Sequence, residues 1–223
     1  MGFLNRYNSP ADLPRELKVF PLPGALLLPR AELPLNIFEP RYLEMVEAAM
    51  AGDRLIGMIQ PEDEEADLAG SPGLCRVGCA GRVTSYAETP DNRILITLTG
   101  VSRFVIVKEI EAAMPYRQVV ADFTPFASDL VSENKADDVD RPGLLKVFRD
   151  YLDANEMSAD WEQVNAASTE TLVNTLSLLA PYAPRDKQAL LEAPDLKSRA
   201  DVLIALTEMA LARAGSGAGS GLQ

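Results

Sequence analysis

Prolines recur at short intervals in the apolar segment PLPGALLLPRAELPLNIFEPRY, which covers residues 21–42. The segment contains five prolines, and each of them fixes φ and removes a backbone hydrogen-bond donor. Such a segment cannot form a long helix or the middle of a central strand. Short strands at the edges and corners of a curved sheet tolerate these prolines. The segment therefore predicts a small, bent β structure.

Short apolar runs continue to about residue 125 and extend this prediction. We expect strands at residues 17–23, 25–28, 33–38, 55–61, 75–88, 93–100, 101–110 and 116–123. The turn residues Thr-Pro-Asp-Asn at 89–92 are expected to join two of these strands as a hairpin. Many short strands with glycine and proline corners indicate a barrel or a strongly curved sheet.

One helix is predicted within this region, at residues 40–51. Pro40 suits the first turn of a helix, and Glu39 places negative charge at its N-terminus. The helix is more apolar than a surface helix needs, so we expect it to pack across a mouth of the barrel. Core packing is the ordinary explanation for Phe38, Tyr42 and Met45.

The hydrophobic period becomes helical after a polar, acidic stretch. Leu144, Phe148, Tyr151 and Leu152 form one apolar stripe, and Leu172, Leu176 and Leu179 form another. Two further helices are predicted from Pro184 onward and over residues 195–213, which makes a small bundle of four helices. The predicted organisation is an N-terminal extension (1–16), a β-rich domain (17–125), an acidic linker (126–142), a helical bundle (143–214) and a flexible Gly/Ser tail (215–223).

Charge and composition exclude several classes of protein. The net charge of −12 argues against nucleic acid as the main ligand, although Arg76, Arg82, Arg93 and Arg103 could form a local basic cluster. No apolar run approaches the ~20 residues that cross a bilayer, and the N-terminus lacks a secretory signal. We therefore expect a cytoplasmic protein without a membrane partner. The two cysteines, Cys75 and Cys79, make a poor zinc site and are expected to pack as small apolar residues.

Catalytic motifs are also missing from the sequence. The chain has no histidine, which excludes Ser-His-Asp and Cys-His catalysis and imidazole acid–base chemistry. No lysine follows a glycine, so the phosphate-binding P-loop is absent. The acidic runs at 62–67 and 136–140 are typical of solvated loops. We expect no enzyme activity and identify no catalytic, cofactor-binding or metal-binding residue.

Four separated motifs resemble the Lon protease N-terminal domain family, the LON substrate-binding domain. The first is VFPLPGALLLPRAELPLNIFEPRYLEMVEAAM at residues 19–50, and the second is the strand VGCAGRV at 77–83. The third is PDNRILITLTGVSRFVI at 90–106, and the fourth is KQALLEAPDLKSRADVLIAL at 187–206. They occur in the family's order and cover residues 17 to about 213.

The resemblance implies an α+β fold, in which a PUA-like β pseudo-barrel with one packed helix precedes a C-terminal helical bundle. In full-length Lon this region recruits substrate polypeptides and helps the hexamer to assemble, and it contributes no catalytic residue. The chain resembles a bacterial-type, stand-alone LON-domain protein without the ATPase and protease modules. We therefore expect a proteolysis-related, non-catalytic module that binds unfolded or partly folded polypeptides or one specific protein, as an adaptor or chaperone-like factor.

The predicted binding surface combines the helix at 40–51 with the strand before it. Phe38, Tyr42 and Met45 are the candidate apolar anchors, and Arg41 is the candidate polar rim. RNA binding by a PUA-like barrel is one alternative function. A small-molecule sensor with a pocket between barrel and bundle is another. The sequence leaves the oligomeric state open.

Overall fold

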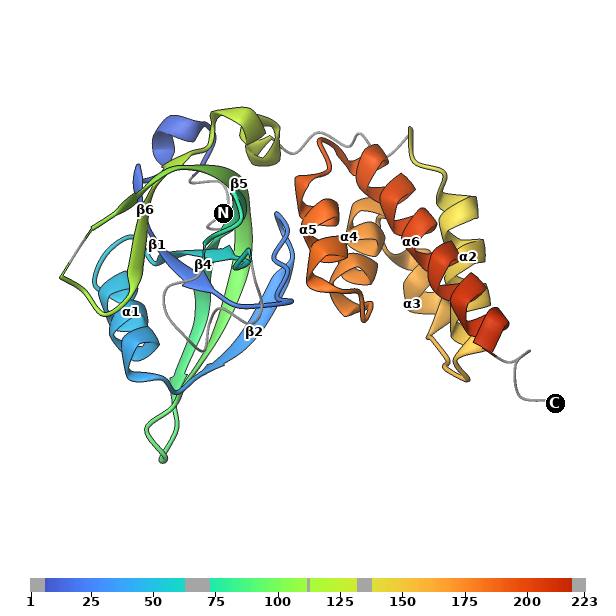
Figure 1. Ribbon diagram of the computed structural model, residues 1–223, viewed down its shortest axis with the longest axis horizontal. Helices are drawn as coiled ribbons and strands as arrows, with labels where there is room; N and C mark the ends of the chain where they lie inside the picture. Colours follow the sequence, from blue (N-terminus) through green and yellow to red (C-terminus); the bar gives the residue numbers. More distant parts are fainter. Residues whose placement is uncertain (1–6, 63–72, 112, 132–137, 218–223) are drawn as a thin grey trace. The chain divides into compact units, whose positions relative to one another are not determined.

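The computed structural model describes residues 7–62, 73–111, 113–131 and 138–217. The chain divides into two compact units, residues 1–132 and 133–223, which we call the β unit and the helical unit (Figure 1). Most of the predicted acidic loop at 62–67 lies outside the described residues. Within the described part of the chain, no helix is both long enough and apolar enough to cross a membrane.

In its described residues, the β unit contains six strands, one α-helix and two 3-10 helices. The strands are β1 (Glu16–Pro21), β2 (Glu32–Ile37), β3 (Leu55–Ile59), β4 (Val77–Glu88), β5 (Ile94–Ile110) and β6 (Arg117–Asp122). The helices are η2 (Pro10–Asp12), α1 (Pro40–Met50) and η4 (Thr124–Leu130). As predicted, α1 begins at Pro40. Proline is tolerated there because the N–H groups of the first helical turn have no partner within the helix.

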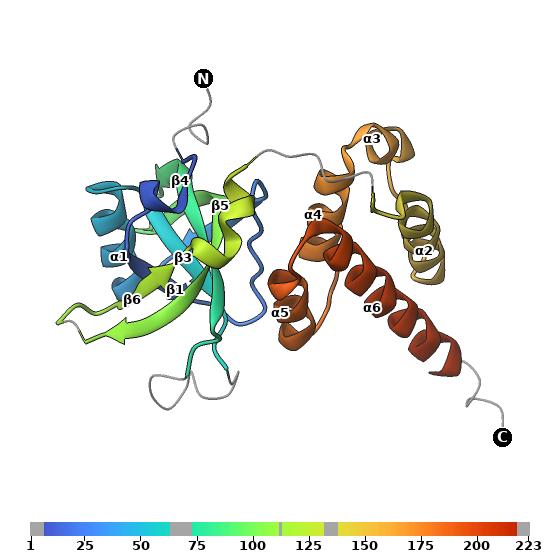
Figure 2. The same cartoon turned by 90° about the horizontal axis from the view of Figure 1, so that it is seen from above.

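The sheet of the β unit closes on itself. Its strand order is β2-β5-β4-β3-β1-β6, and β6 also pairs with β5, so five strands form a ring and β2 extends it at β5. The β1–β3 pair is parallel and the other pairs are antiparallel. Figures 1 and 2 show α1 on the outside of this ring, and it packs against β1 and β3.

Three of the predicted strands differ from the structure. In the predicted strand at 25–28, Leu26, Leu27 and Leu28 are buried but form no strand, because the chain here runs as a loop between Gly24 (φ 70°) and Arg30 (φ 65°). The predicted strands at 93–100 and 101–110 are one continuous strand, β5. The pairing of β4 with β5 shifts by one residue between Ala80 and Gly81 of β4. This shift bends the paired strands and lets β5 continue past Gly100.

The core of the β unit lies inside the ring of strands and is centred on Phe104. The Phe104 side chain is fully buried, and the Phe123 side chain packs against it with ring centroids 5.9 Å apart. A Cβ atom on Gly78 would lie 2.6 Å from the Phe104 ring and 2.7 Å from the Met58 carbonyl oxygen. Gly78 therefore makes room for the fully buried Phe104 ring.

The β unit extends beyond the predicted domain limits at both ends. Tyr7 and Leu13 belong to its buried core, so residues 7–15 are not a separate extension. At the other end, η4 returns to the sheet, where the Arg103 guanidinium forms an ion pair with Asp129 at 2.8 Å. Residues 126–130 of the predicted linker are therefore part of the β unit. The polar residues of this stretch suggested a linker, because the sequence does not distinguish a buried aspartate such as Asp129 from an exposed one.

The helical unit contains five helices, not the predicted four, in the described part of the chain. They are α2 (Arg141–Ala154), α3 (Trp161–Ala166), α4 (Thr169–Leu179), α5 (Pro184–Glu192) and α6 (Leu196–Gly217). The longest, α6, packs against α2, α4 and α5 (Figure 2). The predicted tail begins inside α6, and residues 218–223 lie outside the described residues.

A buried arginine links three of these helices. The Arg199 side chain on α6 donates to the Leu190 carbonyl oxygen at the end of α5 (2.9 Å) and to Asn174 Oδ1 on α4 (3.3 Å). Ser168 caps α4, because its side chain accepts the Thr171 N–H. Leu179 differs from the predicted stripe, since 76% of its surface is exposed.

Hydrogen bonds at the start of the β unit predict sensitivity to acid. The Asp12 carboxylate accepts the N–H groups of Asn8 and Ser9 at 2.9 Å, and these bonds lower the pKa of Asp12 below its usual 3.8. The unfolded chain therefore takes up this proton at a higher pH than the folded chain does. The stabilisation is complete above about pH 5 and is lost as the pH falls through about 4 and below.

We expect Asp12→Asn to remove this part of the acid sensitivity. Thermal unfolding of the β unit between pH 6 and pH 2.5 should then decline less steeply in the variant than in the original chain. Identical pH profiles for the two proteins would show that Asp12 does not couple folding to protonation.

Candidate polypeptide-binding surfaces

The four predicted contact residues fall into two groups in the structure. Phe38 is 59% exposed and Arg41 is also exposed, whereas Tyr42 (5% exposed) and Met45 (0%) are buried under α1. Tyr42 packs on Phe20 with ring centroids 4.1 Å apart. The expected core role thus fits Tyr42 and Met45 and is wrong for Phe38. Helical periodicity places Tyr42 and Met45 on the inner face but says nothing about Phe38, which precedes the helix.

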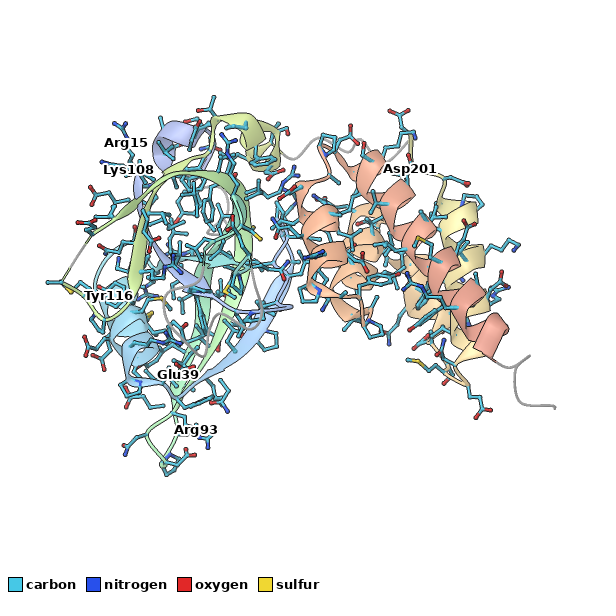
Figure 3. The ribbon with its side chains drawn as sticks, viewed as in Figure 1. Arg15, Glu39, Arg93, Lys108, Tyr116 and Asp201 are labelled. Carbon is cyan, nitrogen blue, oxygen red and sulfur yellow. The ribbon has the colours of Figure 1, made fainter. Side chains whose placement is uncertain are left out.

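Phe38 lies where β2, α1 and the β4–β5 hairpin meet. The Arg93 guanidinium lies over its ring, 5.5 Å from the centroid, and Arg93 also pairs with Asp91 at 2.9 Å. Figure 3 shows Glu39, at the start of α1, and Arg93, near the hairpin tip, at the same end of the β unit. Arg41 pairs with Glu39 at 2.9 Å and covers the Tyr42 ring at 4.5 Å.

The strand register extends this exposed region onto β5. Ile37 pairs with Ile94 and both are buried, so the neighbouring Asn36–Leu95 pair faces outward. Leu95 is accordingly exposed, and Arg93 lies two residues before it, just ahead of β5. We call Phe38, Arg41, Arg93 and Leu95 the Phe38 surface. It offers two exposed apolar side chains and two guanidinium groups.

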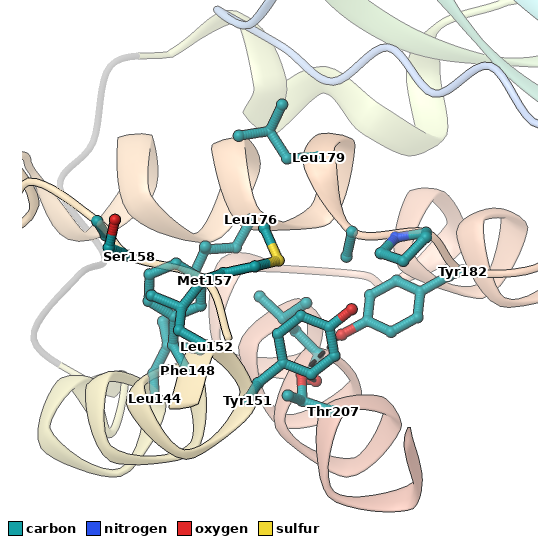
Figure 4. Close-up of a pocket in the computed structure, with 14 residues that line it drawn as sticks. Leu144, Phe148, Tyr151, Leu152, Met157, Ser158, Leu176, Leu179, Tyr182 and Thr207 are labelled. Carbon is teal, nitrogen blue, oxygen red and sulfur yellow. Dashed lines mark hydrogen bonds between the residues drawn. The ribbon is translucent and has the colours of Figure 1, made fainter. Parts of the chain in front are cut away.

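The helical unit contains an apolar pocket of about 430 Å³ that the sequence analysis did not identify. Its floor includes buried Leu144, Leu152 and Leu203. In Figure 4 the Met157 side chain lies among Leu176, Leu152 and Tyr151, whereas Leu179 projects away from them. We call this cavity the helical pocket. Its lining comes from α2, α4, α6 and the loops after α2 and α4, so no single sequence motif announces it.

Two hydroxyl groups of the helical pocket, those of Tyr182 and Thr207, are hydrogen-bonded to each other. The Tyr182 hydroxyl lies 2.6 Å from Thr207 Oγ1, and Thr207 itself donates to the Leu203 carbonyl oxygen at 2.7 Å. Because the Thr207 hydroxyl has one hydrogen, Tyr182 is the donor to Thr207. Burial raises the pKa of Tyr182, so its hydroxyl is neutral at pH 7. A ligand in this pocket meets a mainly apolar lining.

Neither surface has the arrangement of a catalytic site. The described residues that line the helical pocket carry no charged group, so they offer no nucleophile paired with a base. In the described ranges, no three His, Cys, Asp or Glu side chains gather as metal ligands. Both surfaces are suited to binding apolar groups.

Three of the four arginines that favoured nucleic-acid binding have local structural partners. Arg103 is buried against Asp129, and Arg93 pairs with Asp91. Arg82 donates to the Tyr7 hydroxyl at 3.0 Å and to the Asp53 carbonyl oxygen at 2.8 Å. These contacts hold the guanidinium groups to the β unit, which leaves little for a shared phosphate-binding face.

Comparison with known families and proteins extends the resemblance seen in the sequence motifs. The sequence model of the ATP-dependent protease La (LON) substrate-binding domain matches residues 16–208. Lon protease 1 of Bacillus subtilis is 25% identical over 203 residues, which are 86% of this chain and 25% of the relative. Lon protease 2 of Myxococcus xanthus is 23% identical over 92% of this chain and 24% of its own length. The chain thus spans about a quarter of these relatives.

Two solved structures share the fold. A Lon N-terminal domain protein from Xanthomonas campestris has a TM-score of 0.59 and 20% identity, and the match covers 85% of this chain and 97% of that one. The N-terminal domain of Mycobacterium avium complex Lon protease has a TM-score of 0.62 and 16% identity, over 86% of this chain and 98% of that one. The family match over most of the chain and these two folds agree, and the chain belongs to the LON substrate-binding domain family.

Proposed function

We propose that this chain is a non-catalytic module that binds unfolded or partly folded polypeptides, and that the Phe38 surface contacts them. An adaptor or chaperone-like role is the form of this function that we favour. The family match supports a role in substrate recognition. The closed sheet and the helices after it support two finer predictions, a PUA-like β unit and a helical bundle.

The observation that carries this proposal is the exposure of Phe38. An aromatic ring with more than half of its surface in water is unfavourable unless a partner covers it, and here it stands beside a second exposed apolar residue, Leu95. Arg93 lies over the ring, and the exposed Arg41 follows three residues further along the chain. Each guanidinium group has further N–H donors that can bind the backbone carbonyl groups of an extended chain. Tyr42 and Met45 support this surface from below.

We expect Phe38→Ser to weaken polypeptide binding by about tenfold or more, since burying a phenylalanine side chain contributes ~2 kcal/mol. Fluorescence anisotropy of a labelled, permanently unfolded polypeptide measures this loss. The matched control is Val107→Ser, because Val107 is a similarly exposed apolar residue elsewhere on β5. The proposal for this surface fails if the two variants bind the polypeptide equally well.

A labelled single-stranded RNA, titrated in parallel at low and high salt, tests the alternative partner. Binding of polypeptide that survives high salt, with no binding of RNA, supports the proposal. Binding of RNA alone, falling steeply with salt, contradicts it because counterion release marks phosphate recognition.

A further inference from the structure

The helical pocket lies in a strongly acidic part of the helical unit. Residues 144–162, which run from the fourth residue of α2 through the following loop to the second residue of α3, carry five carboxylates and two cations. The carboxylates are Asp150, Asp153, Glu156, Asp160 and Glu162, and the cations are Lys146 and Arg149. Both cations have partners within the unit, since Lys146 donates to Asp150 at 2.9 Å and Arg149 lies 4.4 Å over the Trp161 ring.

Several of these carboxylates lie in the chain segment that forms the pocket wall. Tyr151, Leu152 and residues 157–159 line the pocket, and the exposed Asp153 and Glu156 lie between them in the sequence. On the other side of the pocket, Tyr182 is buried enough to raise its pKa, and the nearby carboxylate of Asp186 adds to this effect. Exposed carboxylates therefore lie within one chain segment that lines the apolar cavity, and Asp186 lies near Tyr182 in another part of the lining.

The open side of the pocket suits a side chain that is presented by a peptide. Met157 is 55% exposed and stands among the lining residues in Figure 4. Methionine adapts its shape to different partners, which favours a site that accepts varied apolar side chains. The volume of the cavity falls within the range of about 300–1,000 Å³ that is typical of ligand sites.

We propose that the helical pocket binds bulky apolar side chains of polypeptide segments that carry lysine or arginine on either side. The apolar side chain fills the cavity, and the flanking cations face Asp153, Glu156 and their acidic neighbours. The inference rests on the proposed polypeptide-binding function and gives it a second contact site and a sequence preference. Charge complementarity favours apolar segments with flanking lysine or arginine over apolar segments without them. It also accelerates their encounter with the helical unit.

The single tryptophan of the chain reports on this pocket. Trp161 packs on Phe148, with ring centroids 6.0 Å apart, and Phe148 lines the pocket. A tryptophan-free peptide that enters the cavity should therefore change Trp161 emission. The probe is a capped ten-residue peptide with a central Leu-Phe pair, two lysines on each side, and glycine and serine elsewhere. Two comparison peptides replace the lysines by glutamates, or the Leu-Phe pair by serines.

We expect the basic apolar peptide to change Trp161 emission saturably, and each comparison peptide to bind at least tenfold more weakly. Met157→Ser should weaken the basic peptide about tenfold. Met209→Ser should leave it unchanged, because Met209 is a similarly exposed methionine of α6 outside the pocket lining. Asp153→Asn combined with Glu156→Gln should reduce the preference for lysine over glutamate without unfolding the unit, since both side chains are exposed.

Three results would overturn this inference and leave the proposed function in place. The lysine and glutamate peptides could bind equally, which removes the charge preference. The unfolded polypeptide could bind through Phe38 while Met157→Ser has no effect, which removes the pocket. Octanol at the same concentration could change Trp161 emission as strongly as the peptide does, which makes the pocket a small-molecule site. Loss of all polypeptide binding, by contrast, would reject the proposed function itself.

Discussion

Replacing Asp129 by alanine is expected to destabilise the β unit by about 3–5 kcal/mol. The Asp129 carboxylate accepts from the Arg103 backbone N–H at 3.0 Å and from the guanidinium Nε at 2.9 Å and Nη2 at 2.8 Å. Arg103 is only 2% exposed and stacks over Phe126 at 4.2 Å, so it cannot turn to water when its partner is removed. The loss leaves a buried cation without its counter-ion, and η4 detaches from the sheet.

Chemical denaturation followed by near-UV circular dichroism measures this loss, and Trp161 fluorescence separately follows the helical unit. Ser128→Ala is the matched control, because Ser128 is an exposed residue of the same 3-10 helix. The double variant Arg103→Met with Asp129→Leu should recover much of the stability, since it removes both buried charges. A cost for Asp129→Ala no larger than that of Ser128→Ala would contradict the role assigned to the ion pair.

Gly100→Ala is expected to cost the β unit about 3 kcal/mol. A Cβ atom at this position would lie 2.0 Å from the Leu28 carbonyl oxygen, and the contact is with backbone, which cannot rotate away. The same place holds two hydrogen bonds, from the Arg30 N–H to the Gly100 oxygen (2.8 Å) and from the Gly100 N–H to the Ala31 oxygen (2.9 Å). Relieving the clash separates the buried loop from β5 and breaks both bonds.

Gly52→Ala is the matched control for this prediction. Its added Cβ would meet nothing closer than the Ala48 carbonyl oxygen at 3.6 Å, which is ordinary contact. The control should change the free energy of unfolding by no more than about 0.5 kcal/mol. Equal stabilities for the two alanine variants, measured by the same denaturation, would show that the loop can move away from β5 at no cost.

The sequence predicted elements well where one local rule decided the outcome. Proline at the start of α1, and the turn residues at 89–92 between β4 and β5, both specify their structure within a few residues. Residues 25–28 show the limit of such rules, because their apolar side chains predict burial and not ladder pairing. Gly100 was predicted to end a strand. In the structure a glycine is needed there because a loop about 70 residues earlier in the chain passes too close for a side chain.

The candidate surfaces were harder to predict than the fold. Phe38 and Tyr42 are both apolar, yet only the register of β2 against β5 and the packing of α1 on Phe20 decide which of them is exposed. The helical pocket combines side chains from α2, α4 and α6 with those of two loops, so it exists only in three dimensions. The motifs that identified the family include three buried residues, Arg103, Phe104 and Arg199. The first two belong to the interior of the β unit, and Arg199 belongs to the interior of the helical unit.

Strand β1 pairs with β3 in parallel and with β6 antiparallel, and these two pairings set the order in which the β unit can be completed. A ribosome that has released only the first hundred residues has made β1 but not its second neighbour, and one edge of that strand lacks a partner. Truncations that end before Asp122 should therefore aggregate or recruit chaperones, because an unpaired strand edge is a template for other chains. The β unit can close its sheet only when its last strand has left the ribosome.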